Sequence, residues 1–364
     1  MRAARPRRAA RGAARRPHDD RPGLDPTGAR RGAGARGAHP WRPPARPPEQ
    51  PRPLPEAGPR RAAGDRVTFR CAAESVLRDE DVAGTATHVR TWLLLEHVGP
   101  WGSEALLDAR LPEGLGGALT ERARTHRAKV LLIRRFSSKP DGPGLRVFAA
   151  YADPVAPRLE SGTLADPREV LDLDLAALRE GGSSGLAAYD GSLFCVCTNG
   201  RHDACCAERG RPVAQALDRA HPEETWEVSH IGGDRFAANL VVLPHGLYYG
   251  RLDVPSSLAV AGAHLAGELD LDHLRGRSSW PMPVQAAEIH LRRELGATRV
   301  DDVVLRERVL DGDFTSASFS VAGGTYAVVV RTIRDQRTAA RLTCKAVRDN
   351  PVPRHEVIKV VRRS

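Results

Sequence analysis

The sequence predicts an α/β protein that follows a long basic tail and precedes a small α+β module. From about residue 62 to residue 270, short apolar runs alternate with amphipathic segments, which is typical of strands covered by helices. Residues 280–364 contain one helical pattern and then strands that alternate apolar and polar residues, as in a sheet with one solvated face. Residues 1–61 contain almost no large aliphatic side chain. The predicted domains are therefore 1–61, 62–270 and 280–364.

The tail holds sixteen arginines, thirteen prolines and five acidic residues, but no lysine and no serine. Its formal charge of +11 accounts for the +10 of the whole chain, so the remainder is close to neutral. Such a segment buries too little apolar surface to offset its conformational entropy, and we expect it to be disordered. Trp41 is its one aromatic residue and no nucleic-acid-binding fold follows, so the tail does not favour a nucleic-acid partner.

The chain has no apolar segment that matches a secretory signal, and no uncharged run of the roughly 18 residues that a membrane span requires. We therefore expect a cytoplasmic protein without a membrane partner. Thiols stay reduced in that compartment, so clustered cysteines favour metal binding or redox chemistry over structural disulfides.

The first part of the α/β module has the pattern of a strand–helix–strand unit. Apolar residues recur at helical spacing over residues 112–128, between two continuous apolar runs. Glycine and proline in residues 137–144 predict a hairpin turn before a third strand. The predicted strands are 90–98, 129–136 and 145–152.

The same pattern continues in the rest of the chain, although the sequence shows no internal repeat. Pro212 and Pro255 stand near the expected starts of two helices, where proline is tolerated. The predicted strands are 192–199, 225–232, 239–252, 301–310, 315–323 and 325–334, and the predicted helices are 211–221, 255–269 and 284–295.

Four of the six cysteines lie in the segment FCVCTNGRHDACCA, residues 194–207. Cys195 and Cys197 are two apart on a predicted strand, so their side chains point to the same face. The loop that follows returns the chain to Cys205 and Cys206 just ahead of the next helix, where the helix dipole favours a thiolate. One of this pair is therefore expected to meet Cys197 across the loop.

A second segment, SHIGGDRFAAN at residues 229–239, carries the other candidate ligands. A predicted strand ends at His230, and two glycines allow a tight reversal before Asp234. The reversal is expected to bring His230 and Asp234 to one site. Together with two cysteines they make four possible metal ligands.

The motifs CTNGRHDACCAERGRP and SHIGGDRFAANLVVLPHGLYYGR, with the upstream GTATHVRTWLLLEHVGPWG, resemble the sucrase/ferredoxin-like family from about residue 70 to residue 296. The resemblance implies a thioredoxin-like ferredoxin module in which two cysteines and two histidines hold a [2Fe-2S] cluster. It places the cysteine ligands at Cys197 and Cys206, the first histidine at His230 and the fourth ligand at Asp234. It further implies electron transfer between redox partner proteins, with no enzymatic turnover.

Asp234 departs from the family's second histidine. A carboxylate can bind iron but is a harder ligand than imidazole. Either Asp234 binds directly, or Cys205, His202 or Cys71 replaces it, or the site has lost its cluster. If Asp234 binds, its charge predicts a lower and less pH-dependent reduction potential than that of a bis-histidine relative.

Two other functions compete with the ferredoxin. A structural zinc site also uses cysteine and histidine, although its ligands usually stand two to four residues apart, whereas eight residues separate Cys197 from Cys206. A thiol–disulfide oxidoreductase would require a Cys-x-x-Cys motif, which is missing. No hydrolase motif is present. Cys195 is expected to be a core residue, and Cys344, on a predicted strand, is expected to have no ligand role.

Overall fold

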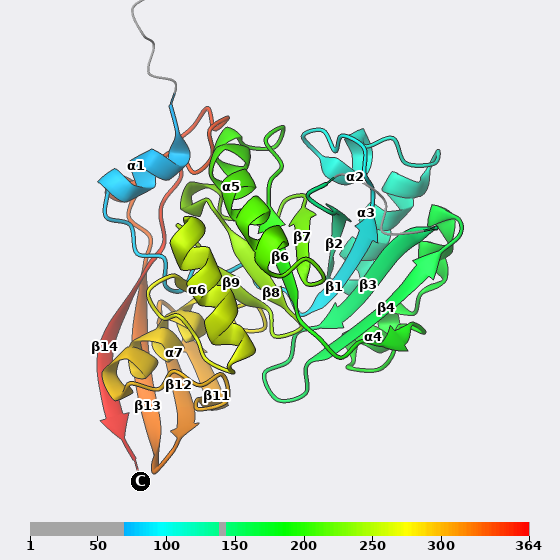
Figure 1. The fold of residues 1–364 in the computed structure, drawn as a ribbon. Coiled ribbons are helices and arrows are strands. Elements are labelled where there is room, and N and C mark those ends of the chain that lie inside the picture. Colours follow the sequence, from blue (N-terminus) through cyan, green and yellow to red (C-terminus); the bar gives the residue numbers. More distant parts are fainter. Residues whose placement is uncertain (1–68, 138–142, 364) are drawn as a thin grey trace, which may run out of the picture. The chain divides into compact units, whose positions relative to one another are not determined.

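The computed structural model describes residues 69–137 and 143–363. The predicted tail 1–61 and most of the predicted turn at 137–144 lie outside the described residues. The helices are α1 (Cys71–Leu77), α2 (Ala105–Asp108), α3 (Leu115–His126), α4 (Leu175–Arg179), α5 (Ala204–Ala220), α6 (Val254–Leu265) and α7 (Met282–Leu295) (Figure 1).

The strands form two sheets, so the predicted α/β class is confirmed. A mixed ten-stranded sheet has the order β10-β9-β8-β6-β7-β2-β1-β3-β4-β5, and an antiparallel sheet has the order β11-β12-β13-β14. The strands are β1 (Thr91–Glu96), β2 (Ala128–Arg134), β3 (Leu145–Tyr151), β4 (Arg158–Leu164), β5 (Ala187–Ala188), β6 (Leu193–Cys197), β7 (Thr225–Val228), β8 (Leu240–Leu243), β9 (Leu247–Tyr249), β10 (Leu274–Arg277), β11 (Val304–Asp311), β12 (Phe314–Val321), β13 (Gly324–Ile333) and β14 (Arg354–Arg362).

The large sheet contains the same connectivity twice, which the sequence did not show. In the first half, β1 and β2 are parallel with α3 between them, β3 and β4 continue the sheet as antiparallel neighbours beyond β1, and α4 follows. In the second half, β6 and β7 are parallel with α5 between them, β8 and β9 continue beyond β6, and α6 follows. This is the thioredoxin-like order of elements that the resemblance implies, present in each half.

The two halves join through β2 and β7, which are antiparallel and share two residue pairs, Ile133 with Val228 and Arg134 with Glu227. Side chains provide the rest of the junction. Phe148 of the first half and Trp226 of the second half meet edge to face with their ring centroids 5.5 Å apart, inside one buried core. Helices α5 and α6 cover the other face of the second half, and α3 and α4 cover that of the first.

The antiparallel sheet packs against α7. Val284 and Leu291 of the helix lie in one buried cluster with Phe319 and Val330 of the strands. Along β12 the buried positions alternate with more exposed ones, as the sequence predicts for a sheet with one solvated face. The predicted boundary between residues 270 and 280 stays a prediction.

Helix α5 begins seven residues before the predicted start at residue 211. The side chain of Asp203 caps it, and Pro212 lies inside the helix. The predicted start, taken from the helical pattern of residues 211–221, was therefore too late. Cys205 and Cys206 therefore lie in the first turn of α5, not ahead of it. Cys344 lies in a turn, not on the predicted strand, and β14 follows later.

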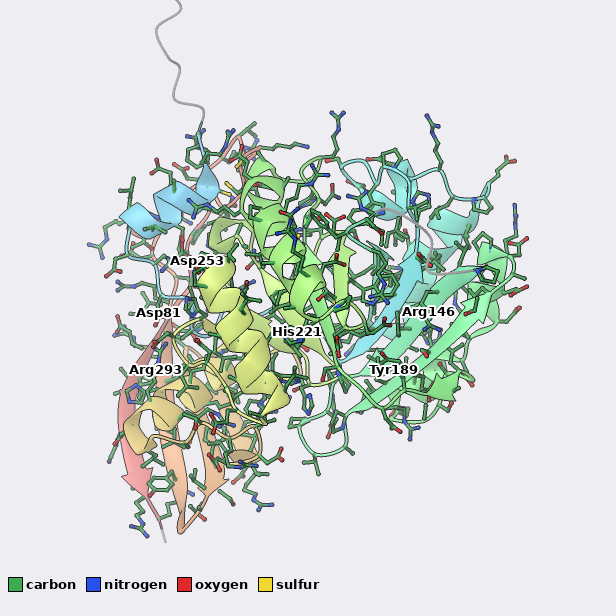
Figure 2. All side chains as sticks on the ribbon, viewed as in Figure 1. Asp81, Arg146, Tyr189, His221, Asp253 and Arg293 are labelled. Carbon is green, nitrogen blue, oxygen red and sulfur yellow. The ribbon has the colours of Figure 1, made fainter. Side chains whose placement is uncertain are left out.

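Several elements were not predicted, including α1, β4, β10 and β14. Helix α6 was predicted correctly apart from its ends. It begins with a capping box in which Asp253, labelled in Figure 2, and Ser256 bond each other's backbone N–H groups. None of the described helices is both long and apolar enough to cross a bilayer.

Buried His264 on α6 predicts acid sensitivity. Burial lowers its pKa to about 4, with His245 and Arg277 adding to the effect, whereas a histidine in the unfolded chain titrates near about 6.5. The unfolded chain therefore binds more protons between these values, so the stability contributed by neutral His264 is complete above about pH 6.5 and decreases as pH falls toward about 4. We expect a loss of up to about 3 kcal/mol.

Urea unfolding at several pH values checks this expectation. His264→Gln should flatten the decrease in unfolding free energy below about pH 6.5. An equally steep decrease in the variant would show that other groups cause the acid sensitivity.

Candidate metal centre

The first part of the candidate centre lies where β6 ends and α5 begins. Cys197 is the last residue of β6. Asp203 caps α5 by accepting a hydrogen bond from the Cys205 N–H at 2.9 Å. At Gly210 the helix approaches the strand so closely that a Cβ would lie 2.2 Å from the carbonyl oxygen of Cys197. The cap and the close approach together bring Cys206 beside the end of the strand.

The second part is the reversal after β7. The chain leaves the sheet at His230 and turns at Gly232 and Gly233, whose φ angles are +102° and +81°. This left-handed region favours glycine, so the predicted tight turn is confirmed. Asp234, the first residue of a short 3-10 helix (Asp234–Phe236), returns to His230. Its Oδ1 lies 3.1 Å from Nδ1 of that histidine.

These two parts meet. The Cys206 thiol donates to Oδ1 of Asp234 at 3.2 Å, and the Cys197 thiol donates to the Ser229 carbonyl oxygen at 3.0 Å. The electrostatic influence of Cys206 and His230 on the pKa of the Cys197 thiol links that thiol to both residues. Both thiols and the carboxylate are buried, while His230 is partly exposed. The structure therefore brings together all four residues that the resemblance places at the ligand positions.

His202, from the loop before α5, completes the group. Its ring stacks on that of His230 with centroids 3.7 Å apart. Its Nε2 lies 3.6 Å from Oδ2 of Asp234, and its Nδ1 lies 3.0 Å from the carbonyl oxygen of Ser103 in the first half. The side chain is 30% exposed, against 3% for Asp234, so His202 lies at the outer edge of the centre.

The electrostatics of this group favour the charged forms of Cys197, His230 and Asp234 but the neutral thiol of Cys206. The interaction with Cys206 lowers the pKa of Cys197 to about 5, against the effect of burial, and His230 adds to the lowering. The same interaction with Cys197, together with burial, raises the pKa of Cys206 well above its usual range. Burial alone would lower the pKa of His230, but Asp234 and Cys197 outweigh it and raise that pKa to about 9. Burial would raise the pKa of Asp234, whereas His202 and His230 hold it well below its usual range.

Residues 82–261 match the sucrase/ferredoxin-like family. Over this span the chain belongs to that family. No curated protein and no solved structure matches the chain. The matched residues include the β6–α5 loop, the glycine turn and both halves of the large sheet up to α6.

The donor set of this sucrase/ferredoxin-like domain fits a group that prefers sulfur and nitrogen ligands. Thiolates and imidazole suit iron–sulfur clusters and zinc. Nδ1 of His230 is buried and makes no well-aligned hydrogen bond, although it lies 3.1 Å from Oδ1 of Asp234. A buried polar atom normally has a partner, and a metal ion would supply one to this nitrogen in exchange for its proton. A cavity of about 360 Å³, lined in part by His202, His230 and Lys129, adjoins it.

Cys71 and Cys205, two of the residues that could replace Asp234 as the fourth ligand, do not lie in the same group of possible ligands as Asp234. Cys71 and Cys205 gather with Asp203 and Cys344, apart from the group that contains His202, His230 and Asp234. Cys195 is fully buried in the core, as expected. Among the alternatives named from the sequence, only His202 lies beside Asp234.

Arg275 on β10 positions the glycine turn, and sequence reasoning missed it. It is buried, and its guanidinium donates to the carbonyl oxygens of Gly232 at 3.0 Å and Thr85 at 2.6 Å and to Oδ1 of Asn239 at 2.8 Å. Burial lowers its pKa to about 10, so it remains a cation near neutral pH. The residue lies outside the matched span, in the polar segment DLDHLRGRSS (residues 270–279), which gives no sequence signal of a buried strand.

Proposed function

We propose that this protein is a ferredoxin-like electron carrier that holds a [2Fe-2S] cluster on Cys197, Cys206, His230 and Asp234, and that it does not turn over a substrate. The observation that carries the proposal is the convergence of two buried thiols, an imidazole and a buried carboxylate at the ends of β6 and β7. When bound, such a cluster accepts and gives up one electron at a time.

The chain's own residues would do three things for this cofactor. The buried thiols and the carboxylate would bind it away from water. Buried Arg275 and the nearby Lys129 would offset their negative charge, since the pKa values of both respond to Cys197 and Asp234. Desolvation and fixed charges around a cluster are the means by which a protein sets its potential.

The two histidines mark the side from which redox partner proteins would approach. His230 and His202 are 27% and 30% exposed, whereas the other members of the group are buried. The cavity next to them is walled by α2 and the start of β2 from the first half. We infer that the second half binds the cofactor and the first half forms part of the docking surface.

Asp234 is a better candidate for the fourth ligand than His202. Its Oδ1 lies within 3.2 Å of both the Cys206 sulfur and the His230 nitrogen. The His202 ring stacks on that of His230, and its Nε2 lies 3.6 Å from Oδ2 of Asp234, on the exposed side of the group. A carboxylate at this position adds a negative charge, which lowers the reduction potential relative to an imidazole ligand.

Anaerobic expression in iron-replete cells tests the proposal. We expect two irons and two acid-labile sulfides per chain, as a [2Fe-2S] cluster contains, with visible absorption and an EPR signal after reduction. Asp234→Ala should shorten the lifetime of the cluster by about tenfold or more. Asp234→His should keep the cluster, raise its potential and make that potential more dependent on pH. His202→Ala should keep the cluster.

Three other outcomes would contradict the proposal or its choice of ligands. A colourless wild-type protein with one zinc bound to these residues would refute the electron-carrier proposal. Loss of the cluster in His202→Ala but not in Asp234→Ala would show that His202 is the fourth ligand. Metal-free protein that cycles between thiols and a Cys197–Cys206 disulfide would indicate a thiol redox function instead.

A further inference from the structure

Three thiols from distant parts of the chain converge at the start of α5. Cys71 begins α1, Cys205 lies in the first turn of α5, and Cys344 lies in the turn before β14. The sulfur of Cys344 lies 3.4 Å from that of Cys205 and 3.6 Å from that of Cys71. None of the three cysteines forms a disulfide. The separations approach the edge of about 3.8 Å that a tetrahedron of sulfurs around zinc would have.

Asp203 supplies a fourth donor to the same group. Both of its carboxylate oxygens lie 3.6 Å from the sulfur of Cys71, and the ligand atoms of all four residues lie within 4.8 Å of one another. The carboxylate also accepts hydrogen bonds from the N–H groups of Cys205 at 2.9 Å and Cys344 at 2.6 Å. These two bonds fix the carboxylate and leave further lone pairs available.

The charge of this carboxylate is not balanced by a side chain. Asp203 is fully buried, and within residues 69–137 and 143–363 no cationic side chain forms an ion pair with it. The nearby Arg70 is held instead by Glu208, through a contact of 2.6 Å. Two backbone N–H groups and the N-terminus of α5 stabilise the carboxylate. A divalent cation among these donors would add the full opposite charge that the backbone groups do not carry.

The donor set identifies the class of metal. Thiolates select zinc or iron over calcium and magnesium, which prefer oxygen. The four ligand atoms converge on one point, which suits a single ion, whereas the ligands of an iron–sulfur cluster are divided among several irons. Four protein donors with no open position are typical of a structural zinc site.

We propose that Cys71, Cys205, Cys344 and Asp203 form a structural zinc site, distinct from the centre at Cys197 and Cys206. Cys71 and Cys344 lie outside the span that matches the family, so the site joins segments before and after that span to α5. Binding would release the thiol protons and hold the first turn of α5 in place. The inference does not depend on which group the first centre binds.

The proposed site would also support the first centre. Cys205 is adjacent to Cys206, so fixing one fixes the backbone of the other. The residue after Cys344, Lys345, donates to the hydroxyl oxygen of Ser103 at 3.1 Å, and the carbonyl oxygen of that serine contacts His202 at 3.0 Å. The zinc site therefore anchors the C-terminal turn against the wall of the electron-transfer centre.

Metal analysis of the full chain, purified anaerobically from cells supplied with zinc and iron, tests the proposal. We expect one zinc per chain, falling about tenfold or more in Cys205→Ser and in Cys344→Ser. Cys206→Ser and Cys195→Ala, which leave the four donors intact, should keep the zinc. Cobalt added to the metal-free protein should give the intense visible bands of a tetrahedral cobalt–thiolate site, and Cys344→Ser should abolish them.

Failure of this inference is distinguishable from failure of the electron-carrier proposal. Zinc that is retained in both Cys205→Ser and Cys344→Ser, or lost only in Cys206→Ser, would overturn the site, whatever the iron content. A Cys205–Cys344 disulfide in zinc-free protein, detected by mass spectrometry without reductant, would also overturn it. Cys344 is partly exposed, so its variant provides a test if Cys205→Ser does not fold.

Discussion

Cys206→Ser is expected to remove the iron and the acid-labile sulfide while leaving the fold intact. The Cys206 sulfur lies 3.2 Å from Oδ1 of Asp234, and Cys206 has the largest influence on the pKa of Cys197. A serine oxygen is similar in size but is a poor ligand for iron. Because loss of outer-shell partners already costs 10- to 100-fold in metal affinity, we expect iron and sulfide per chain to fall by at least about tenfold.

Cys195→Ala serves as the matched control for this measurement. It changes a fully buried cysteine on the same strand face as Cys197, outside both groups of candidate ligands, so it should retain the visible absorption and most of the iron. Cys206→Ser protein with wild-type iron and sulfide content would remove Cys206 from the ligand set. Circular dichroism distinguishes loss of the cluster from loss of the fold.

Arg275→Met is expected to cause the largest loss of stability of any single change near the centre. The substitution keeps much of the side chain's volume but leaves four acceptor atoms without their donor: the carbonyl and hydroxyl oxygens of Thr85, the carbonyl oxygen of Gly232 and Oδ1 of Asn239. Each unsatisfied buried acceptor costs about 1–3 kcal/mol. Because the turn can relax at some of these atoms, we expect the free energy of unfolding to fall by about 3–5 kcal/mol in total.

Denaturant unfolding of Arg275→Met beside wild-type protein measures this effect. Arg293→Met is the matched control, because Arg293 lies on the exposed side of α7 (Figure 2) and bonds only the carbonyl oxygen of Leu271, at 2.8 Å, so its change should stay within about 0.5 kcal/mol. An Arg275→Met protein as stable as wild type, with an unchanged cluster lifetime, would mean that the glycine turn holds its shape unaided.

The local parts of the centre could be predicted because short sequence patterns determine them. Cys197 lies at a strand end, and Gly232 and Gly233 permit the reversal that returns Asp234 to His230. The predicted start of α5 was wrong, because the helix begins at the capping residue Asp203, ahead of the apolar pattern of residues 211–221 that predicted it.

The remaining features depend on tertiary contacts that no local pattern encodes. Cys71, Cys205 and Cys344 are each more than 130 residues from the next in sequence, and their convergence requires α1 and the C-terminal turn to pack on α5. Arg275 contacts the glycine turn from β10. This strand forms the edge of the large sheet that is farthest from the first half. The repeated connectivity is visible only in the strand order. The cysteine motif that marks the second half has no counterpart in the first, which contains no cysteine between Thr91 and Arg179.

The short ladder between β2 and β7 has a mechanical consequence. Two residue pairs join the halves along the backbone, and the pair at one end contains Val228. Ser229, the next residue, still bonds β2 through its N–H, which donates to the Leu132 carbonyl oxygen at 2.9 Å, and His230 then leaves the sheet. A force that pulls the halves apart acts on the bond between Ser229 and β2. Only this one residue separates the end of the ladder at Val228 from His230, so the force would also displace His230. Strain applied by a docked partner to the first half would therefore be transmitted to the residue that we propose as a cluster ligand.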